Sequence, residues 1–304
     1  MTHLEDCPAL IGATSEQIGY TCKLKVYPDG STAITCADRP IFHPEGWEER
    51  NPKQKTKANA LVDAEDATIH PNRADWEAQQ IRARASVARS KRRALTALRD
   101  YSLCNDFRYF VTLTLDKARI DRYDYAVIIR AMSTWADNMV RRKGLRYILV
   151  PERHKDGALH FHGFFPEGVE VTDSGTISMP GAKRPRKPRS AKQRDEWIAQ
   201  GGHIVYNLPD WKFGYSTAIE LYGQYHAAVA YVCKYVSKAE EKTGGRWYFS
   251  GGKLKRPEIQ YTDMDFAELL RSETAKAYTV PDIGVRLAYD FISLGGVICQ
   301  ETGY

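Results

Sequence analysis

The sequence predicts an α+β fold in which a mostly antiparallel β-sheet is covered by packed helices. Three observations lead to this class. Short runs of aromatic and β-branched residues with alternating polarity recur between residues 105 and 250, as in strands. Two segments there bring apolar residues back at helical spacing. The elements follow the order strand, helix, hairpin, strand, helix and strand, which gives one sheet with helices against it.

Residues 1–73 are expected to form a hairpin followed by a polar loop, and residues 74–104 a long basic helix. Residues 20–37 hold two alternating runs around "PDGS", which is a hairpin signal. Residues 38–73 are rich in Pro, Asn and Lys and predict a loop. The cations of the helix either form a solvated face or contact phosphates. Its DNA-binding candidates are Arg89, Arg92 and Arg93.

The central segment, 105–250, is expected to carry the sheet. The predicted elements are a strand at 107–115, a helix at 124–142, a strand, turn and strand at 145–165, a strand at 213–222, a helix at 224–242 and a strand at 246–250. This order is ferredoxin-like, or RRM-like. The C-terminal residues 251–304 have no predicted role.

A basic insert, 181–200, interrupts the central segment. Its run "KRPRKPRSAKQR" over 183–194 contains prolines, which remove backbone donors, so we expect no regular element and a flexible surface segment. The insert either binds a nucleic-acid backbone or is merely solvated. Its DNA-binding candidates are Lys183, Arg184, Arg186 and Lys187.

Charge and cysteine usage narrow the class of protein. The 304 residues carry a formal net charge of +6, which suggests a polyanionic partner. No long apolar run and no secretion signal occur, so we expect a cytoplasmic protein without a membrane partner. The cysteines form no C-x-x-C pair, as in reduced thiols. Zinc is a sharper alternative, although the spacing matches no standard finger. Its ligands would be Cys7, Cys22, Cys36 and His43.

A metal site is predicted on the hairpin at 145–165. His160 and His162 are two residues apart on a strand, so both imidazoles leave the same face. With the turn at "KDG", Glu152 lies opposite His160, with about 5 Å between Cβ atoms. His154 shares that face but falls at the turn, and we rank it after Glu152. Two nitrogens and a carboxylate suit Mn²⁺, or Mg²⁺ where availability decides. The alternative is that the histidines are structural or merely exposed.

The helix at 224–242 carries candidate nucleophiles in "YVCKYVSK". Tyr231 and Tyr235 are four residues apart, so both phenols leave one face about 6 Å apart. Lys234 and Lys238 each follow a tyrosine by three residues. Such residues are often plain packing residues, and a phenol with a pKa of about 10 is a poor nucleophile by itself. A nearby divalent cation and lysines lower the cost of ionisation, which favours tyrosine attack on a phosphodiester.

Three motifs together resemble those of the HUH endonucleases that initiate rolling-circle replication. They are the strand "FVTLTL", the "HFH" of 160–162 and the helix "YVCKYVSK". The last is most similar to the two-tyrosine form in the replication initiators (Rep) of microvirus-like phages and of related plasmids and prophages. The resemblance covers 107–250, about half of the chain. It implies an HUH endonuclease core that nicks and joins single-stranded DNA at a specific site.

The resemblance also implies roles for the residues and a setting for the reaction. The implied metal ligands are His160, His162 and, less directly, Glu152. The implied nucleophiles, which alternate, are Tyr231 and Tyr235. One forms a 5′-phosphotyrosine link and frees a 3′-OH, and the second attacks after a round of synthesis so that the displaced strand is rejoined. The implied phosphate contacts are Lys238 and Lys234. The site of action would be the cytoplasm of a bacterial host.

The expected partners are origin DNA and host proteins. No Walker A sequence occurs, so a host helicase would unwind the duplex and a host polymerase would extend the 3′-OH. Aromatic side chains can stack the bases of a single strand. The candidates are Trp211, Tyr215 and Tyr222, and the alternative for each of them is a place in the core. The alternatives are a relaxase or transposase of the same fold, a non-catalytic single-stranded nucleic-acid-binding module, and a metal-dependent hydrolase that uses water.

Overall fold

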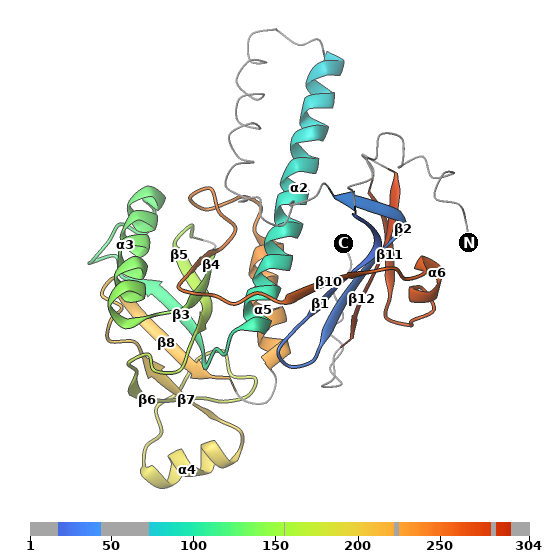
Figure 1. Cartoon of the computed structure of the whole chain (residues 1–304). Coiled ribbons are helices and arrows are strands. Elements are labelled where there is room, and N and C mark those ends of the chain that lie inside the picture. The colour runs from blue at the N-terminus through green and yellow to red at the C-terminus, as the bar shows by residue number, and fades with distance from the viewer. Residues whose placement is uncertain (1–17, 44–72, 155, 222–224, 281–283, 293–304) are drawn as a thin grey trace. The chain divides into compact units, whose positions relative to one another are not determined.

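The computed structural model describes residues 18–43, 73–154, 156–221, 225–280 and 284–292 (Figure 1). Within these residues the chain has an α+β fold with two antiparallel sheets, which confirms the predicted class. The chain divides into two compact units. The first unit is Met1–Ser86 with Glu258–Ile298, and the second is Val87–Pro257 with Cys299–Tyr304. Helix α2 (Arg73–Cys104) contributes residues to both.

The first unit holds a five-stranded antiparallel sheet in the order β10-β1-β2-β12-β11. Its elements are β1 (Ile18–Val26), β2 (Thr32–His43), β10 (Glu258–Thr262), α6 (Phe266–Leu269), β11 (Lys276–Val280) and β12 (Val285–Ile292). The predicted hairpin is confirmed as β1 and β2. The predicted loop start at residue 38 is wrong, because β2 continues to His43 by pairing with Ile18–Tyr20.

Two of the cysteines considered as zinc ligands meet in this sheet. Cys22 and Cys36 are opposite residues of β1 and β2, both fully buried, with their Sγ atoms 2.6 Å apart. Burial raises the pKa of each thiol. Cys7 and the side chain of His43 lie outside the described residues, so the zinc set stays a prediction.

The second unit holds a seven-stranded antiparallel sheet in the order β6-β7-β8-β3-β5-β4-β9. Its elements are β3 (Tyr109–Leu115), α3 (Tyr125–Lys143), β4 (Tyr147–Arg153), β5 (Leu159–Phe165), β6 (Thr172–Ser178), α4 (Ala191–Ala199), β7 (His203–Asn207), β8 (Gly214–Glu220), α5 (Tyr225–Lys238) and β9 (Phe249–Gly251). All seven elements predicted for 107–250 occur. The strands β6 and β7 were not predicted.

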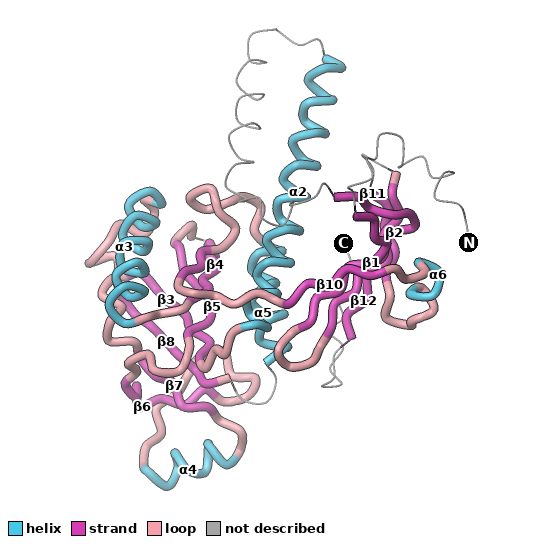
Figure 2. Tube along the Cα trace, in the orientation of Figure 1, coloured by secondary structure: helices cyan, strands magenta, loops and turns pink. Residues whose placement is uncertain are grey.

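The two faces of this sheet carry different side chains, because successive residues of a strand point to opposite sides. On one face, Val111 and Phe161 belong to a buried cluster with Ile128 and Met132 of α3. The other face carries Thr112, Thr114 and the histidines, and α5 packs there over β4 (Figure 2). Helix α5 forms because its buried valines recur at helical spacing. They are Val229, Val232 and Val236.

The basic insert is ordered, which corrects the expectation of a flexible segment without regular structure. Helix α4 begins at Ala191, after the last proline of the run, and Ser190 caps it by accepting a hydrogen bond from the backbone N–H of Gln193. Before the helix, the backbones of Ile177 and Arg186 exchange two hydrogen bonds. Proline excludes a helix only where it lies inside one, so the run "AKQR" was free to become helical.

Candidate active site

Strand register brings the predicted metal ligands together on β3, β4 and β5. Glu152 of β4 lies opposite His160 of β5, as the hairpin pattern predicts. On the other side of β5, Thr112 and Thr114 of β3 lie opposite His162 and His160. His162 is buried, with 8% of its surface exposed, and His160 is half-buried. The site therefore lies on three adjacent strands of the sheet.

Two threonine hydroxyls hold the imidazole rings. Thr112 Oγ1 is 3.1 Å from His162 Nδ1, and Thr114 Oγ1 is 3.2 Å from His160 Nδ1. A partner at Nδ1 fixes the ring and leaves Nε2 for a ligand, which is the arrangement typical of metal-binding histidines. Sequence reasoning did not assign this role. The T-x-T spacing of β3 matches the H-x-H spacing of β5 and was a usable signal.

Glu152 contacts His162, the diagonal neighbour, although it lies opposite His160. Its Oε2 atom is 2.7 Å from His162 Nε2. This hydrogen bond is the main cause that lowers the pKa of Glu152, and the charges of the neighbouring histidines add to it. Glu152 is therefore ionised at neutral pH.

His154 also belongs to this cluster. Its ring stacks on that of His160, with centroids 3.8 Å apart. Burial, with the nearby His154 and His162, lowers the pKa of His160 to about 4. The neutral imidazole is the form that binds metal. His154 is exposed at the turn, and its rank behind Glu152 as a ligand stays a prediction.

Helix α5 places both tyrosines against the histidine face. The Tyr235 ring stacks on His162 with centroids 4.2 Å apart and 5° between planes, and its hydroxyl donates a hydrogen bond of 2.7 Å to Tyr231 Oη. Tyr231 packs edge-on against Phe110 of β3 and keeps 51% of its surface exposed. Burial, then the bond to Tyr231, raises the pKa of Tyr235 above its ordinary value. Two phenols and an imidazole–carboxylate pair thus form one contact chain.

The predicted lysines of α5 are exposed, and a lysine that was not predicted supports the helix. Lys234 and Lys238 both lie on the surface. The Lys91 Nζ atom of α2 donates to the carbonyls of Ser237 and Ala239 at 2.6 and 2.7 Å. These carbonyls lie in the last turn of α5 and just after its end, where a cation is favourable. Lys91 therefore anchors the helix that carries the tyrosines.

The predicted DNA-binding residues are exposed but come from separate elements. Arg89, Arg92 and Arg93 are on the surface of α2. The four candidates of the insert are exposed in the loop between β6 and α4. The sheet order separates β6 from β5, the histidine strand, by β7, β8 and β3. The insert is therefore not a part of the histidine cluster.

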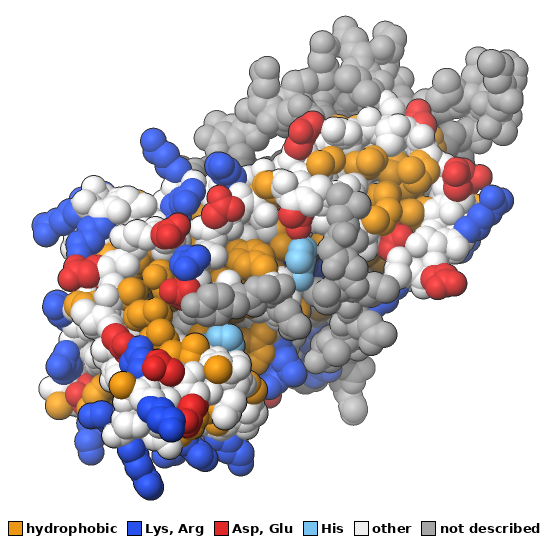
Figure 3. Space-filling view, turned by 90° about the horizontal axis from the view of Figure 1, so that it is seen from below, with side chains coloured by type: hydrophobic (Ala, Val, Ile, Leu, Met, Phe, Trp, Pro, Cys, Tyr) orange, Lys and Arg blue, Asp and Glu red, His pale blue; other side chains and the backbone are white. Residues whose placement is uncertain are grey.

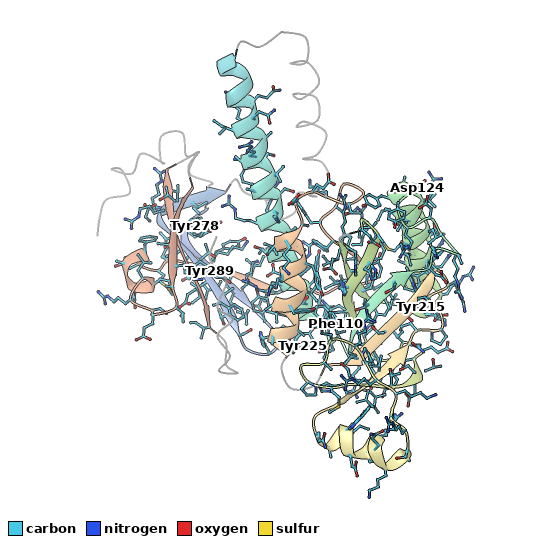
Figure 4. All side chains as sticks on the ribbon, turned by 180° about the vertical axis from the view of Figure 1, so that it is seen from behind. Phe110, Asp124, Tyr215, Tyr225, Tyr278 and Tyr289 are labelled. Atoms are coloured by element: carbon cyan, nitrogen blue, oxygen red, sulfur yellow. The ribbon has the colours of Figure 1, made fainter. Side chains whose placement is uncertain are left out.

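The three candidate stacking aromatics differ. Trp211 is 3% exposed, packs against Trp135 and donates to the carbonyl of Thr114, so of its two predicted roles it has the core one. Tyr215 of β8 is 70% exposed (Figure 4). It lies opposite Thr114, in the sheet row that continues to His160. Tyr222 lies outside the described residues.

The donor set of the histidine cluster fits a divalent metal, although the described residues hold no preformed ion site. Among the described residues, no three His, Cys, Asp or Glu side chains are grouped to hold an ion. The histidine cluster nevertheless offers two oriented imidazoles and an ionised carboxylate. Nitrogen with carboxylate oxygen suits a borderline ion. The ligands would be His160, His162 and Glu152, after Glu152 turns from His162.

One family matches the part of the chain that contains this site. Residues 108–240 match the family model of the replication-associated protein ORF2. The matched segment runs from β3 to just past α5, less than half of the chain, and includes every residue of the histidine and tyrosine cluster. The match supports a role as a replication initiator, with DNA as partner. Neither the curated proteins nor the solved structures gave a match. No helix within the described ranges is long and apolar enough to span a membrane.

Proposed function

We propose that the chain initiates rolling-circle replication as an HUH endonuclease of the two-tyrosine type, related to those of microvirus-like phages and plasmids. It would nick single-stranded origin DNA by tyrosine transesterification. The observation that supports this best is that α5 places two hydrogen-bonded phenols on the histidine face of the sheet. Tyr235 stacks on His162, and the hydroxyls of Tyr231 and Tyr235 are 2.7 Å apart. A plain packing helix has no need for two linked phenols, one of which stacks on an imidazole.

Tyr231 is the better placed tyrosine for the first attack. Half of its surface is exposed, whereas Tyr235 lies partly buried on His162. In the first step, the Tyr231 oxygen bonds to phosphorus and loses its proton. The bond from phosphorus to the 3′ oxygen breaks, and that oxygen takes a proton to become a 3′-OH. The phosphodiester is conserved as a 5′-phosphotyrosine link, so resealing needs no ATP.

Tyr235 would act in the second step. After one round of synthesis, its oxygen attacks the regenerated junction and a new 3′-OH leaves. That 3′-OH attacks the phosphorus held by Tyr231, which closes the displaced strand and returns the proton to Tyr231. The short distance between the two hydroxyls lets both reactions occur within one site.

The surrounding side chains would orient the phosphate. Lys238 and Lys234, exposed on the same helix, would contact its oxygens. A divalent ion, Mn²⁺ or Mg²⁺, when bound by the histidines and Glu152, polarises the phosphodiester. The exposed ring of Tyr215 would stack a base of the single strand along the row that leads to His160. A host helicase would unwind the duplex to supply the single strand, and a host polymerase would extend the 3′-OH.

A covalent adduct assay tests this function. Single-stranded oligonucleotides that tile the genome encoding the chain are labelled at the 3′ end and incubated with protein and Mn²⁺. A 5′-phosphotyrosine link keeps the label on the protein in a denaturing gel. Y231F should abolish the adduct, and Y123F, which removes another exposed hydroxyl of the second unit, should not.

Each other outcome selects a different function. Adduct loss in Y235F alone would reverse the order of attack. Cleaved DNA without an adduct would indicate a nuclease that uses water. DNA that is bound but intact would indicate a binding module without catalysis. An adduct that persists in the Y231F/Y235F double variant would refute both tyrosines.

A further inference from the structure

The segment from β6 to β7, residues 172–207 and here called the arm, is strongly basic. Residues 181–200 contain seven Lys and Arg and two Asp and Glu, a balance of 7 − 2 = +5, against +6 for all 304 residues. Figure 2 shows α4 set apart from the other helices of this unit. Lys and Arg side chains also fringe the lower left of the surface in Figure 3. The arm is therefore one of two strongly basic segments; the other is α2, with eight Lys and Arg against three Asp and Glu.

Most cations of the arm have no ion-pair partner among the described residues. The exposed ones are Lys183, Arg184, Arg186, Lys187, Arg189 and Lys192. Arg194 is the contrast, because it bonds to Asp173 at 2.6 Å, and this bond lowers the pKa of Asp173. A solvated face commonly interleaves acidic partners with its cations. Six free cations within ten residues instead fit a row of phosphates.

The arm presents these cations on an ordered frame. Ile177, fully buried, exchanges backbone hydrogen bonds of 2.8 and 2.9 Å with Arg186, which ties the basic loop to β6. At the other end of α4, Gly202 packs so closely that a Cβ atom there would lie 2.7 Å from the Trp197 carbonyl oxygen. A fixed frame reduces the entropy lost on binding.

The side chains of the arm suit double-stranded rather than single-stranded DNA. Single-strand sites combine cations with exposed aromatic rings that stack bases, whereas duplex binding rests on phosphates. Within residues 172–207, Ile198 is the one large apolar side chain that is clearly exposed, and no ring is. The exposed rings of Tyr215 and Tyr231 lie instead on β8 and α5, toward the histidines.

The distance across the sheet from the histidine strand β5 to β6 of the arm is compatible with binding of DNA beside the nick. From β5 to β6 there are four strand spacings. At about 4.8 Å each, they span roughly 19 Å. Along a duplex this equals about six base pairs at 3.4 Å per step.

We propose that the arm binds the double-stranded DNA that flanks the nick site, while the single strand is held at the histidine face. This proposal rests on the proposed function for its location relative to the nick, but the binding preference is measurable without cleavage. The arm would thus retain the initiator beside its origin while the nicked strand moves through the site.

The test compares the affinity of the full chain for two labelled DNAs by fluorescence anisotropy. One is a duplex of about 20 base pairs and the other a single strand of about 12 nucleotides, titrated between about 50 and 200 mM salt. The arm variant is R184A/R186A/K187A. The matched control, R130A/R141A/R142A, removes three exposed charges from α3, which packs on the sheet face opposite the histidines.

The arm variant should lose at least about tenfold in duplex affinity, and its salt slope should fall by up to about 2.7, or 0.9 per lost phosphate contact. Its single-strand affinity should fall less than about threefold, and the control should lose little for either DNA. Equal losses for both DNAs would overturn the duplex preference, and no loss for either would overturn DNA binding by the arm. A missing tyrosine adduct would defeat the proposed function but leave this comparison readable.

Discussion

Replacing Thr112 with valine removes the hydroxyl behind His162 while keeping the shape of the side chain. The Nδ1 atom of His162 lies 3.1 Å from that hydroxyl in a residue that is only 8% exposed, so water has little access to replace it. An unpaired buried polar group costs about 1–3 kcal/mol. Loss of such a partner reduces metal affinity by about 10- to 100-fold. T114V should have a smaller effect, because His160 is half exposed.

Calorimetric titration with Mn²⁺ and thermal unfolding of the metal-free chain measure the two effects. T112S restores the hydroxyl and should recover most of the affinity. T217V is the matched control, because Thr217 lies opposite Thr112 on β8 without a hydrogen bond to either histidine. Wild-type Mn²⁺ affinity in T112V, or an equal loss in T217V, would refute the reasoning that this hydroxyl orients the ligand.

Three further predictions concern the frame of the site. In G163A, the new Cβ would lie 1.8 Å from the Ile148 carbonyl oxygen, so β4 and β5 must separate and the unfolding free energy should fall by about 3 kcal/mol; an unchanged denaturation midpoint would contradict this close approach. Y225F removes a hydroxyl that donates to the carbonyls of Ser102 and Asn105, so the unfolding free energy should fall by about 1 kcal/mol. An unchanged midpoint would show that other contacts alone hold α2 and α5 together. Acid should destabilise the metal-free chain through His160: its pKa is lowered to about 4, so between about pH 6.5 and 4 the unfolded state takes up a proton that the folded state does not. The melting temperature of H160Q should therefore fall less over that range than that of the wild type, and parallel curves would count against the shift.

Local patterns predicted most of the second unit. The alternation of "FVTLTL" and the spacing of "HFH" lie within single strands, where the side-chain period alone decides the face. Tyr231 and Tyr235 share one helix face because they are four residues apart, about one helical turn. Glu152 opposite His160 also followed, because a short turn sets the register of its hairpin.

Long-range contacts account for what the sequence did not predict. Strand β10 pairs with β1, and β12 with β2, across more than 230 residues, and no local pattern records such a pairing. The support that Lys91 gives to α5 depends on how two helices meet. Trp211 has the aromatic side chain that base stacking requires, but its indole N–H donates a hydrogen bond to the Thr114 carbonyl inside the core. Helix α4 was not predicted, because the prolines earlier in the run argued against regular structure in all of it. The cap at Ser190 follows the last of these prolines, so the residues after it could form a helix.

Peptide mapping of the DNA adduct is the most direct test of tyrosine attack. The chain is incubated with Mn²⁺ and single-stranded DNA of the genome that encodes it, digested with nuclease and trypsin, and searched for nucleotide-modified peptides. Cleavage after Lys234 places Tyr231 and Tyr235 in different peptides, so the modified residue is read directly. We expect the nucleotide on Tyr231, and its loss in H160A. Cut DNA with both tyrosines unmodified would contradict the account.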